Sequence, residues 1–298
     1  MDKYPQSTLM VYKEERGYLN LLRDVIADGE RRETRNGIVY SLFGKTMEFD
    51  LKDTFPLLTT KKVFFRGIIE ELIFFLKGQT DTKILEKKNI FIWQPNTTAE
   101  FIRSRNLEYE DGDMGPMYGF NWLHFGAEYM GAQADYSGKG VNQLEKVIEL
   151  LRTDPMSRRI IMTSYNPAQA EKGVLYPCHG ISIQFYVSGG KYLSCSMTQR
   201  SSDIACGLPY NIASYSALVY ALCKHLGLEP GRLIIHLGDV HIYDEHLEGA
   251  LEQLSREPLA PPKLSIRGEL ETMGDITYEH FVLEQYAPHP PIKFVMKA

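Results

Sequence analysis

A single β-hairpin constrains the fold of this chain more than any other feature of its sequence. Two segments of strand-forming residues, 181–187 and 192–197, stand on either side of a Ser-Gly-Gly loop at 188–190. A three-residue loop pairs Val187 with Lys191, and this register places polar residues on one face and mostly apolar residues on the other. A two-residue loop would shift the pairing by one and mix the two classes, which a half-buried sheet does not tolerate. The sequence therefore predicts the three-residue loop.

This register brings a thiol and a guanidinium together, because it places Cys178 opposite Arg200 on the polar face. The opposite face is expected to carry Ile181, Ile183 and Phe185. A fixed positive charge beside a cysteine lowers its pKa and raises the thiolate fraction at neutral pH. His179 should point to the other face, so we do not expect it to act as the base for Cys178. The residues alone leave open a plain alternative, a small buried thiol beside a surface cation.

The remaining elements follow from the spacing of apolar residues. Helices are predicted at 17–28, 68–77, 143–151 and 211–226, and further strands at 159–164 and 233–237. An irregular, proline-containing connection at 256–262 should lead to a short β tail. Strands and helices do not alternate strictly, which favours an α+β layered fold over a doubly wound one. We expect residues 1–298 to form one domain, with 1–18 as a flexible N-terminal tail.

Composition excludes several classes of function. The 298 residues carry a net charge of -5 and no basic stripe, so an obligatory nucleic-acid partner is not expected. No signal peptide or apolar segment of about 20 residues is present, so we expect no membrane partner and a cytoplasmic or nuclear location. The four cysteines show neither CxxC spacing nor a histidine at zinc-ligand spacing. Free thiols and no metal are therefore expected.

Seven motifs resemble the thymidylate synthase family in their order and spacing. They are TFPLLTTK at 54–61, GDMGPMYG at 112–119, SRRIIM at 157–162, PCH at 177–179, QRSSD at 199–203, PYNIASY at 209–215 and GDVHIY at 238–243. The resemblance implies a large mixed β-sheet packed with helices and a sheet at the interface of a homodimer. It also implies a methyltransferase that converts dUMP to dTMP with 5,10-methylenetetrahydrofolate and releases dihydrofolate.

The resemblance assigns chemistry to five residues. Thiolate attack by Cys178 on uracil C6 would turn C5 into the nucleophile that captures the one-carbon unit of folate. Glu71 would organise water and proton transfers, although its position alone favours a solvated helix edge. Tyr118 would lie near the C5 proton. Arg200 and Asn211 complete the catalytic set. A side-chain amide can accept from uracil N3–H and donate to O4, so Asn211 selects uracil over cytosine.

The resemblance also implies two binding sets. The substrate set is Arg35, Arg158, Arg159, Arg200, Ser201, Asp203, Asn211, His241 and Tyr243, with Arg158 and Arg159 supplied by the partner subunit. Guanidinium groups suit a phosphate dianion because they form bidentate hydrogen bonds at full charge. The folate set is Ile92, Trp93, Asn96, Asp203, Gly207, Tyr210 and Ala298, in which flat apolar surface and a carboxylate suit a pterin. Taken singly, most of these residues would be ordinary core or surface positions.

The chain departs from the usual family residues mainly on the folate side. The departures are Gln94, Cys206, Tyr210 and the terminal Lys297-Ala298, and segment 34–37 around Arg35 also differs. The nearest enzymatic alternative is a dUMP 5-hydroxymethylase of the same fold, in which water replaces the hydride. An alternative of another class is a nonenzymatic nucleotide- or RNA-binding relative, against which the intact catalytic set argues.

Overall fold

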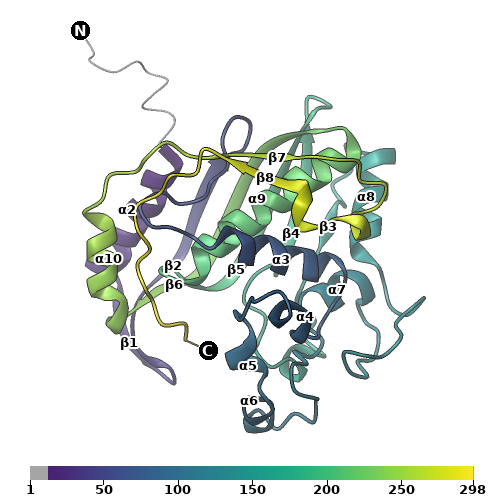
Figure 1. Ribbon diagram of the computed structural model, residues 1–298, viewed down its shortest axis with the longest axis horizontal. Helices are drawn as coiled ribbons and strands as arrows, with labels where there is room; N and C mark the ends of the chain where they lie inside the picture. The colour runs from purple at the N-terminus through teal and green to yellow at the C-terminus, as the bar shows by residue number, and fades with distance from the viewer. Residues whose placement is uncertain (1–12, 298) are drawn as a thin grey trace.

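The computed structural model describes residues 13–297, whose arrangement is shown in Figure 1. Six strands form one mixed sheet in the order β1-β2-β6-β5-β4-β3. The strands are β1 (Glu30–Thr34), β2 (Gly37–Asp50), β3 (Ile161–Met162), β4 (Ser182–Ser188), β5 (Tyr192–Asp203) and β6 (Glu229–Tyr243). All neighbours are antiparallel except β5 and β6, which helix α9 (Gly207–Leu226) connects. A separate two-stranded sheet joins β7 (Lys263–Ile266) to β8 (Phe281–Glu284).

The helices gather on one face of the large sheet. Helix α9 packs on β5 and β6, α3 (Phe65–Leu76) packs on α9, and α2 (Lys13–Asp28) packs on β2. Figure 1 shows α9 running along the sheet, with the segment α4–α6 next to α3. The other helices are α4 (Lys83–Glu86), α5 (Gln94–Thr97), α6 (Ala99–Ser104), α7 (Gly119–His124), α8 (Gln143–Thr153) and α10 (Leu247–Leu254). Short 3-10 turns are η1 (Ala170–Lys172), η2 (Asp244–His246), η3 (Met273–Asp275) and η4 (Tyr278–His280).

The other face of the large sheet is left open in this chain. In β4, Ile183, Phe185 and Val187 are buried in the core, whereas Tyr186 between them is 64% exposed. This alternation confirms the predicted division of the hairpin into a polar and an apolar face. The exposed face also carries Ile161 at 49% exposure, so it is a broad surface of mixed polarity.

The predicted hairpin register was wrong by one residue on each strand. Val187 pairs with Leu193, and the three-residue loop is Gly189–Lys191, in which both glycines are left-handed, at φ +58° and +65°. Pairing partners therefore change by two, which keeps the side chains of β4 on their predicted faces. Residues 178–181 precede β4, and Gly180 there is left-handed at φ +65°. The prediction that His179 points away from Cys178 was therefore wrong, since both side chains line one cavity. Cys178 and Arg200 remain neighbours, since the Arg200 amide donates to the Cys178 carbonyl at 2.7 Å.

The four predicted helices are confirmed within a few residues, but the predicted tail is too long. Helix α2 already begins at Lys13, and Tyr18 is fully buried with its hydroxyl donating to the Ile204 carbonyl at 2.8 Å. Residues 1–12 of the predicted tail lie outside the described residues. The irregular connection at 256–262 and the β tail are confirmed, whereas β1 and β2 were not predicted. No helix within residues 13–297 has the length and apolarity to cross a membrane.

Candidate active site

One cavity of about 280 Å³ collects nearly all of the predicted site residues. Its lining includes Arg35, Glu71, Ile92, Trp93, Asn96, Tyr118, Cys178, Arg200, Ser201, Asp203, Gly207, Tyr210, Asn211, His241 and Tyr243. Arg158 and Arg159 do not line it, and Ala298 lies outside the described residues. The lining residues that were not predicted as site residues are Asn36, Leu175, Tyr176, His179, Gln199, Cys206, Met296 and Lys297.

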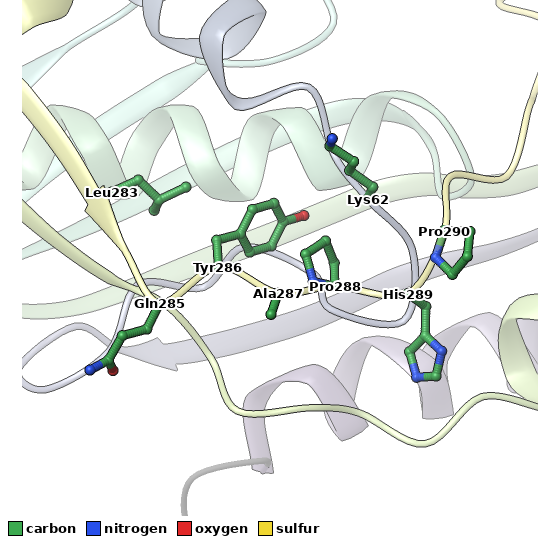
Figure 2. A pocket seen from close by; sticks show the side chains of 8 residues that line it. All are labelled: Lys62, Leu283, Gln285, Tyr286, Ala287, Pro288, His289 and Pro290. Atoms are coloured by element: carbon green, nitrogen blue, oxygen red, sulfur yellow. The ribbon is translucent and has the colours of Figure 1, made fainter.

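A larger groove of about 900 Å³ lies elsewhere on the surface. It is lined by Lys62, Leu283 and the segment 285–290, and Figure 2 shows Lys62 on the segment before α3 and the other side chains along β8 and the chain that follows it. None of the predicted site residues borders this groove. Size alone therefore does not mark the functional site, whereas the convergence of titratable and amide groups does.

The Cys178 thiol sits at the floor of the smaller cavity and is partly open to it. Its Sγ lies 3.4 Å from the Tyr118 hydroxyl, which also accepts a hydrogen bond from the Cys178 amide at 3.3 Å. Burial raises the pKa of this thiol above its usual value, while Tyr118 and Arg200 act to lower it and Glu71 to raise it. The expected increase in thiolate fraction is therefore wrong for the free protein. The guanidinium acts in the predicted direction, but desolvation outweighs it.

Arg200 is held at the rim of the cavity by carbonyl groups. Its Nε donates to the Pro177 carbonyl at 3.2 Å and one Nη to the Tyr176 carbonyl at 3.4 Å. The guanidinium carbon lies 5.0 Å from the centre of the Tyr176 ring. Among residues 13–297, no carboxylate forms an ion pair with Arg200, so its charge is available to an anionic ligand.

Tyr118 has a strained backbone that brings its ring beneath the thiol. Its φ of +33° is unusual for a residue other than glycine and is typical of functional sites. The ring stacks on His179 with centres 4.2 Å apart. Burial lowers the pKa of His179 to about 3, and its Nδ1 is paired with the Tyr215 hydroxyl at 2.9 Å. A neutral, paired imidazole supports the ring of Tyr118, and within the described chain it makes no hydrogen bond to Cys178.

Glu71 projects from α3 toward the cavity, where one side-chain donor holds it. The indole Nε1 of Trp93 donates to Glu71 Oε1 at 2.7 Å. Burial raises the pKa of Glu71 to about 7, although the hydrogen bond from Trp93 acts in the opposite sense. Its neighbour Glu70 faces away and pairs with Lys88 at 2.6 Å. Glu71 is therefore poised to gain or lose a proton near neutral pH.

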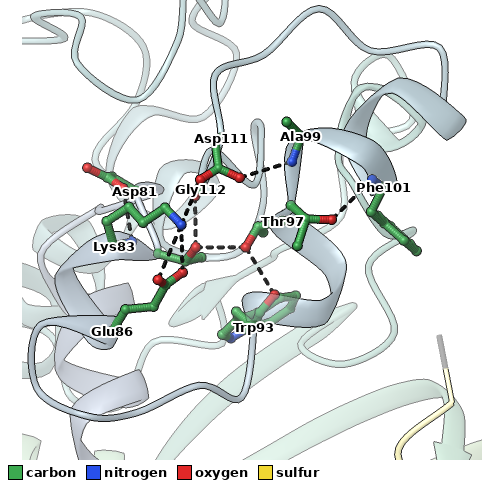
Figure 3. Close-up of polar contacts among 11 residues, drawn as sticks. Asp81, Lys83, Glu86, Trp93, Thr97, Ala99, Phe101, Asp111 and Gly112 are labelled. Carbon is green, nitrogen blue, oxygen red and sulfur yellow. Dashed lines mark hydrogen bonds and ion pairs between the residues drawn. The ribbon is translucent and has the colours of Figure 1, made fainter.

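A polar network fixes the segment that carries Trp93, as Figure 3 shows. The Thr97 hydroxyl donates to the Trp93 carbonyl at 3.0 Å and contacts the Thr82 hydroxyl at 2.8 Å. An ion pair at 2.7 Å joins Lys83 to Asp111, which are the two ends of the segment 83–111 that contains Trp93. The indole is consequently a rigid wall of the cavity, 6.0 Å from the ring of Tyr118.

Two amide side chains in the cavity have polar atoms without hydrogen-bond partners among residues 13–297. Asn211 is only 8% exposed, and its side-chain amide makes no hydrogen bond there. Gln199 donates from Nε2 to the Ser201 carbonyl at 3.2 Å, but its Oε1 is buried without a partner. Leaving a buried acceptor unpaired costs about 1–3 kcal/mol, so these amides are suited to a ligand with complementary donors and acceptors.

Comparison with known proteins identifies the family. A family model described as "Thymidylate synthase" matches residues 16–298. This chain belongs to the thymidylate synthase family. The thymidylate synthase 1/2 of Encephalitozoon cuniculi is 46% identical over 95% of this chain and 97% of the relative. The human thymidylate synthase is also 46% identical, over 94% of this chain and 89% of the relative.

Family membership confirms the resemblance predicted from the motifs, the α+β fold and the activity. The chain is a methyltransferase of dTMP biosynthesis, and no observation favours the hydroxymethylase alternative. In this thymidylate synthase, His241 lines the same cavity, with its Nδ1 2.9 Å from Asp239 Oδ1. Asp203 turns one oxygen, Oδ1, toward the amides of Ala205 and Cys206 at 2.9 and 3.0 Å.

The predicted arginines of this thymidylate synthase fall into two groups. Arg35, in the turn between β1 and β2, lines the cavity together with Arg200. Arg158 and Arg159 are exposed between α8 and β3, at the end of the sheet and outside the cavity. One chain therefore brings two of the four predicted phosphate-binding arginines to its own site.

Proposed function

We propose that this thymidylate synthase methylates dUMP with 5,10-methylenetetrahydrofolate, using Cys178 as a covalent nucleophile, and releases dihydrofolate. The observation that carries the proposal is one cavity that joins the Cys178 thiol, the Glu71 carboxyl group and the free amide of Asn211. A C–S bond from Cys178 to uracil C6 converts C5 into a carbon nucleophile, which bonds to the one-carbon unit of the folate. Loss of the C5 proton and of tetrahydrofolate would leave a methylene group on the ring. Hydride from the tetrahydrofolate would reduce this group to methyl and give dihydrofolate, and elimination of the thiol would restore the ring.

Proton transfer in this scheme falls to Glu71 and Tyr118. A carboxyl group with a pKa of about 7 holds or releases a proton with little cost at neutral pH, which suits the transfers around uracil O4 and the folate. The Tyr118 hydroxyl, 3.4 Å from Sγ, would take part in removal of the proton from C5. Metal is not required for any of these steps.

Substrate selection rests on the unpaired groups. Asn211 would pair with N3–H and O4 of uracil, and Arg200 with Arg35 would bind the phosphate together with Ser201. His241 and Tyr243 would contact the sugar hydroxyl. For the folate, Trp93 and Tyr210 offer flat surface, Asp203 a carboxylate for the pterin edge, and Ile92, Asn96 and Gly207 the surrounding wall.

We infer that the active unit is a homodimer joined through the open face of the large sheet. That face carries exposed apolar side chains such as Tyr186 and Ile161, which a partner would cover. Arg158 and Arg159 lie beside β3 at its margin and would complete the partner's phosphate site. Each chain would act as one catalytic domain, and its free cysteines suit the cytoplasm or nucleus.

The reaction is tested with purified enzyme, dUMP and 5,10-methylenetetrahydrofolate, with the pyrimidine product identified by mass. We expect dTMP and dihydrofolate in equal amounts, and no turnover by Cys178→Ser. Formation of 5-hydroxymethyl-dUMP with release of tetrahydrofolate would establish the hydroxymethylase instead. Turnover that survives Cys178→Ser would remove this residue from the mechanism.

The composite phosphate site is tested by subunit complementation. An Arg158→Ala, Arg159→Ala double variant is mixed with a Cys178→Ser variant under conditions that exchange subunits. In the heterodimer, one site would combine the intact thiol of the arginine variant with the intact arginines of the Cys178→Ser chain. Mixing the two inactive proteins should therefore restore activity. Demonstrated exchange without recovery would show that the arginines do not act in trans.

A further inference from the structure

Three potential metal ligands meet at the edge of the active-site cavity, from positions that the sequence keeps apart. Asp203 ends β5, Cys206 precedes α9, and His246 ends η2. One ligand atom of each lies within 4.8 Å of the other two. Because 40 residues of chain separate the cysteine from the histidine, their spacing matches no zinc pattern, and the expectation of no metal was based on spacing alone.

One ring nitrogen of His246 is hydrogen-bonded, and the other has no hydrogen-bond partner among the described residues. The side chain is 2% exposed, and its Nε2 lies 2.9 Å from the Val295 carbonyl. A carbonyl can only accept, so Nε2 donates to it and Nδ1 is the nitrogen that can face a ligand. Nδ1 is buried with no hydrogen-bond partner among the described residues, and it lies 4.0 Å from Asp203 Oδ2.

The carboxylate and the thiol complete the donor set. Asp203 Oδ1 is engaged by two backbone amides, which orients the carboxylate and leaves Oδ2 directed toward His246. The hydrogen bond from Nε2 to a carbonyl is the outer-shell contact that ligating histidines usually make. A thiolate, an imidazole and a carboxylate together are typical zinc ligands.

We propose that Asp203, Cys206 and His246 bind Zn²⁺ through Oδ2, Sγ and Nδ1, with water as the fourth ligand. Tetrahedral zinc with bonds of about 2.0–2.3 Å holds its ligand atoms about 3.3–3.8 Å apart, so small side-chain movements suffice to close the site. Binding forms the S–Zn bond and releases the thiol proton of Cys206 to solvent. No electron is transferred, and the ion stays divalent.

Charged groups near the site act in both directions. Asp203 and Glu245 favour a cation there, and Lys61 opposes it.

Occupation of this site would interfere with the folate. Asp203 and Cys206 both line the active-site cavity, and the proposed function gives the Asp203 carboxylate to the pterin. Zn²⁺ should therefore raise the KM for 5,10-methylenetetrahydrofolate more than the KM for dUMP. This consequence rests on the proposed function, whereas the binding of the metal itself does not.

Metal binding is measured without substrates, in full-length Cys178→Ser protein so that the catalytic thiol cannot contribute. Calorimetric titration with Zn²⁺ should show one ion per chain and release of a proton, and Co²⁺ should produce thiolate-to-metal charge-transfer absorption. Cys206→Ser and His246→Gln should each weaken Zn²⁺ binding at least about tenfold. Cys223→Ser, which changes a buried thiol away from the site, is the matched control and should leave the affinity unchanged.

The site is refuted if Co²⁺ gives no thiolate band or if Cys206→Ser binds Zn²⁺ as tightly as the control. Should His246→Gln fail to fold, Cys206→Ala and Cys206→Ser decide the question, since Cys206 is only partly buried. Inhibition assays separate the two proposals. Zn²⁺ binding without competition against folate overturns the role of Asp203 in folate binding and leaves the metal site standing.

Discussion

Replacing Glu71 with glutamine should make the enzyme more stable at alkaline pH while it removes the proposed proton-transfer group. The native protein raises the pKa of Glu71 from 4.5 to about 7 through burial. Between these values the native state holds a proton that the unfolded chain has lost. The contribution of Glu71 to the free energy of unfolding therefore falls as pH rises through this interval. Glutamine does not titrate, so the free energy of unfolding of the variant does not fall for this reason.

The magnitude follows from the size of the change in pKa. At about 1.4 kcal/mol per pKa unit, a rise from 4.5 to about 7 corresponds to about 3 kcal/mol. Because the carboxyl group also opens to the cavity, water reduces this penalty, and we expect about 1–2 kcal/mol of stabilisation above the folded-state pKa. The amide oxygen of glutamine can still accept from the Trp93 indole, so the packing of the site is retained.

The assay is urea unfolding of wild type and Glu71→Gln at one protein concentration from about pH 5 to about pH 8. The variant should gain stability relative to wild type as pH rises, with little difference at the acidic end. Glu70→Gln, one position earlier on α3, removes a charge that pairs with Lys88 and should show no such gain. A Glu71→Gln variant that is equally or less stable at alkaline pH would refute the assignment of a raised pKa to this residue.

Three further results are expected. Asn211→Asp should weaken dUMP turnover and improve dCMP binding, since each unpaired group costs about 1–3 kcal/mol, and an unchanged preference would remove Asn211 from base recognition. Trp93→Ser, or deletion of residues 296–298, should admit water and yield 5-hydroxymethyl-dUMP or a stalled reaction; pure dTMP at the normal rate would contradict this. Alkylation of Cys178 by iodoacetamide should still accelerate above pH 9 in the free enzyme, because burial raises the thiol pKa, and a plateau near neutral pH would show that the thiolate is already formed.

The sequence was sufficient for the faces of the hairpin but not for its register. The alternation of Ile183, Phe185 and Val187 with polar residues defines a buried and an exposed face, which any register of the same parity preserves. The register itself depends on a loop with two left-handed glycines, and the preceding residue Ser188 joins the strand instead. Loop conformation is a property of the backbone that residue types constrain only weakly.

Strand β2 shows why part of the sheet could not be predicted. Its 14 residues include Gly44 and Phe43, which is 84% exposed, so no clean alternation runs along the segment. The strand forms because it pairs with β6 over nearly its whole length, from Val39 opposite Tyr243 to Asp50 opposite Arg232. Such long-range pairing is invisible in a local window.

In the candidate site, too, the identity of the residues could be predicted from the sequence, whereas their surroundings could not. Residue types and motif order were enough to predict fifteen members of one cavity. They did not give the sign of the Cys178 pKa, because desolvation depends on how completely distant segments enclose the thiol. They also did not reveal the Asp203, Cys206 and His246 cluster, since a turn after β5 and a turn after β6 meet only in the folded chain.

Burial has the same effect on three titratable groups of the active site. It raises the pKa of Cys178, raises that of Glu71 to about 7 and lowers that of His179 to about 3, so it favours the neutral form of all three. Arg200 is the cation that acts against this trend at the thiol. A phosphate dianion bound to Arg200 would weaken that influence, so substrate binding should not release a free thiolate. Attack on uracil must therefore be coupled to loss of the thiol proton, which protects the nucleophile from side reactions until the substrate is in place.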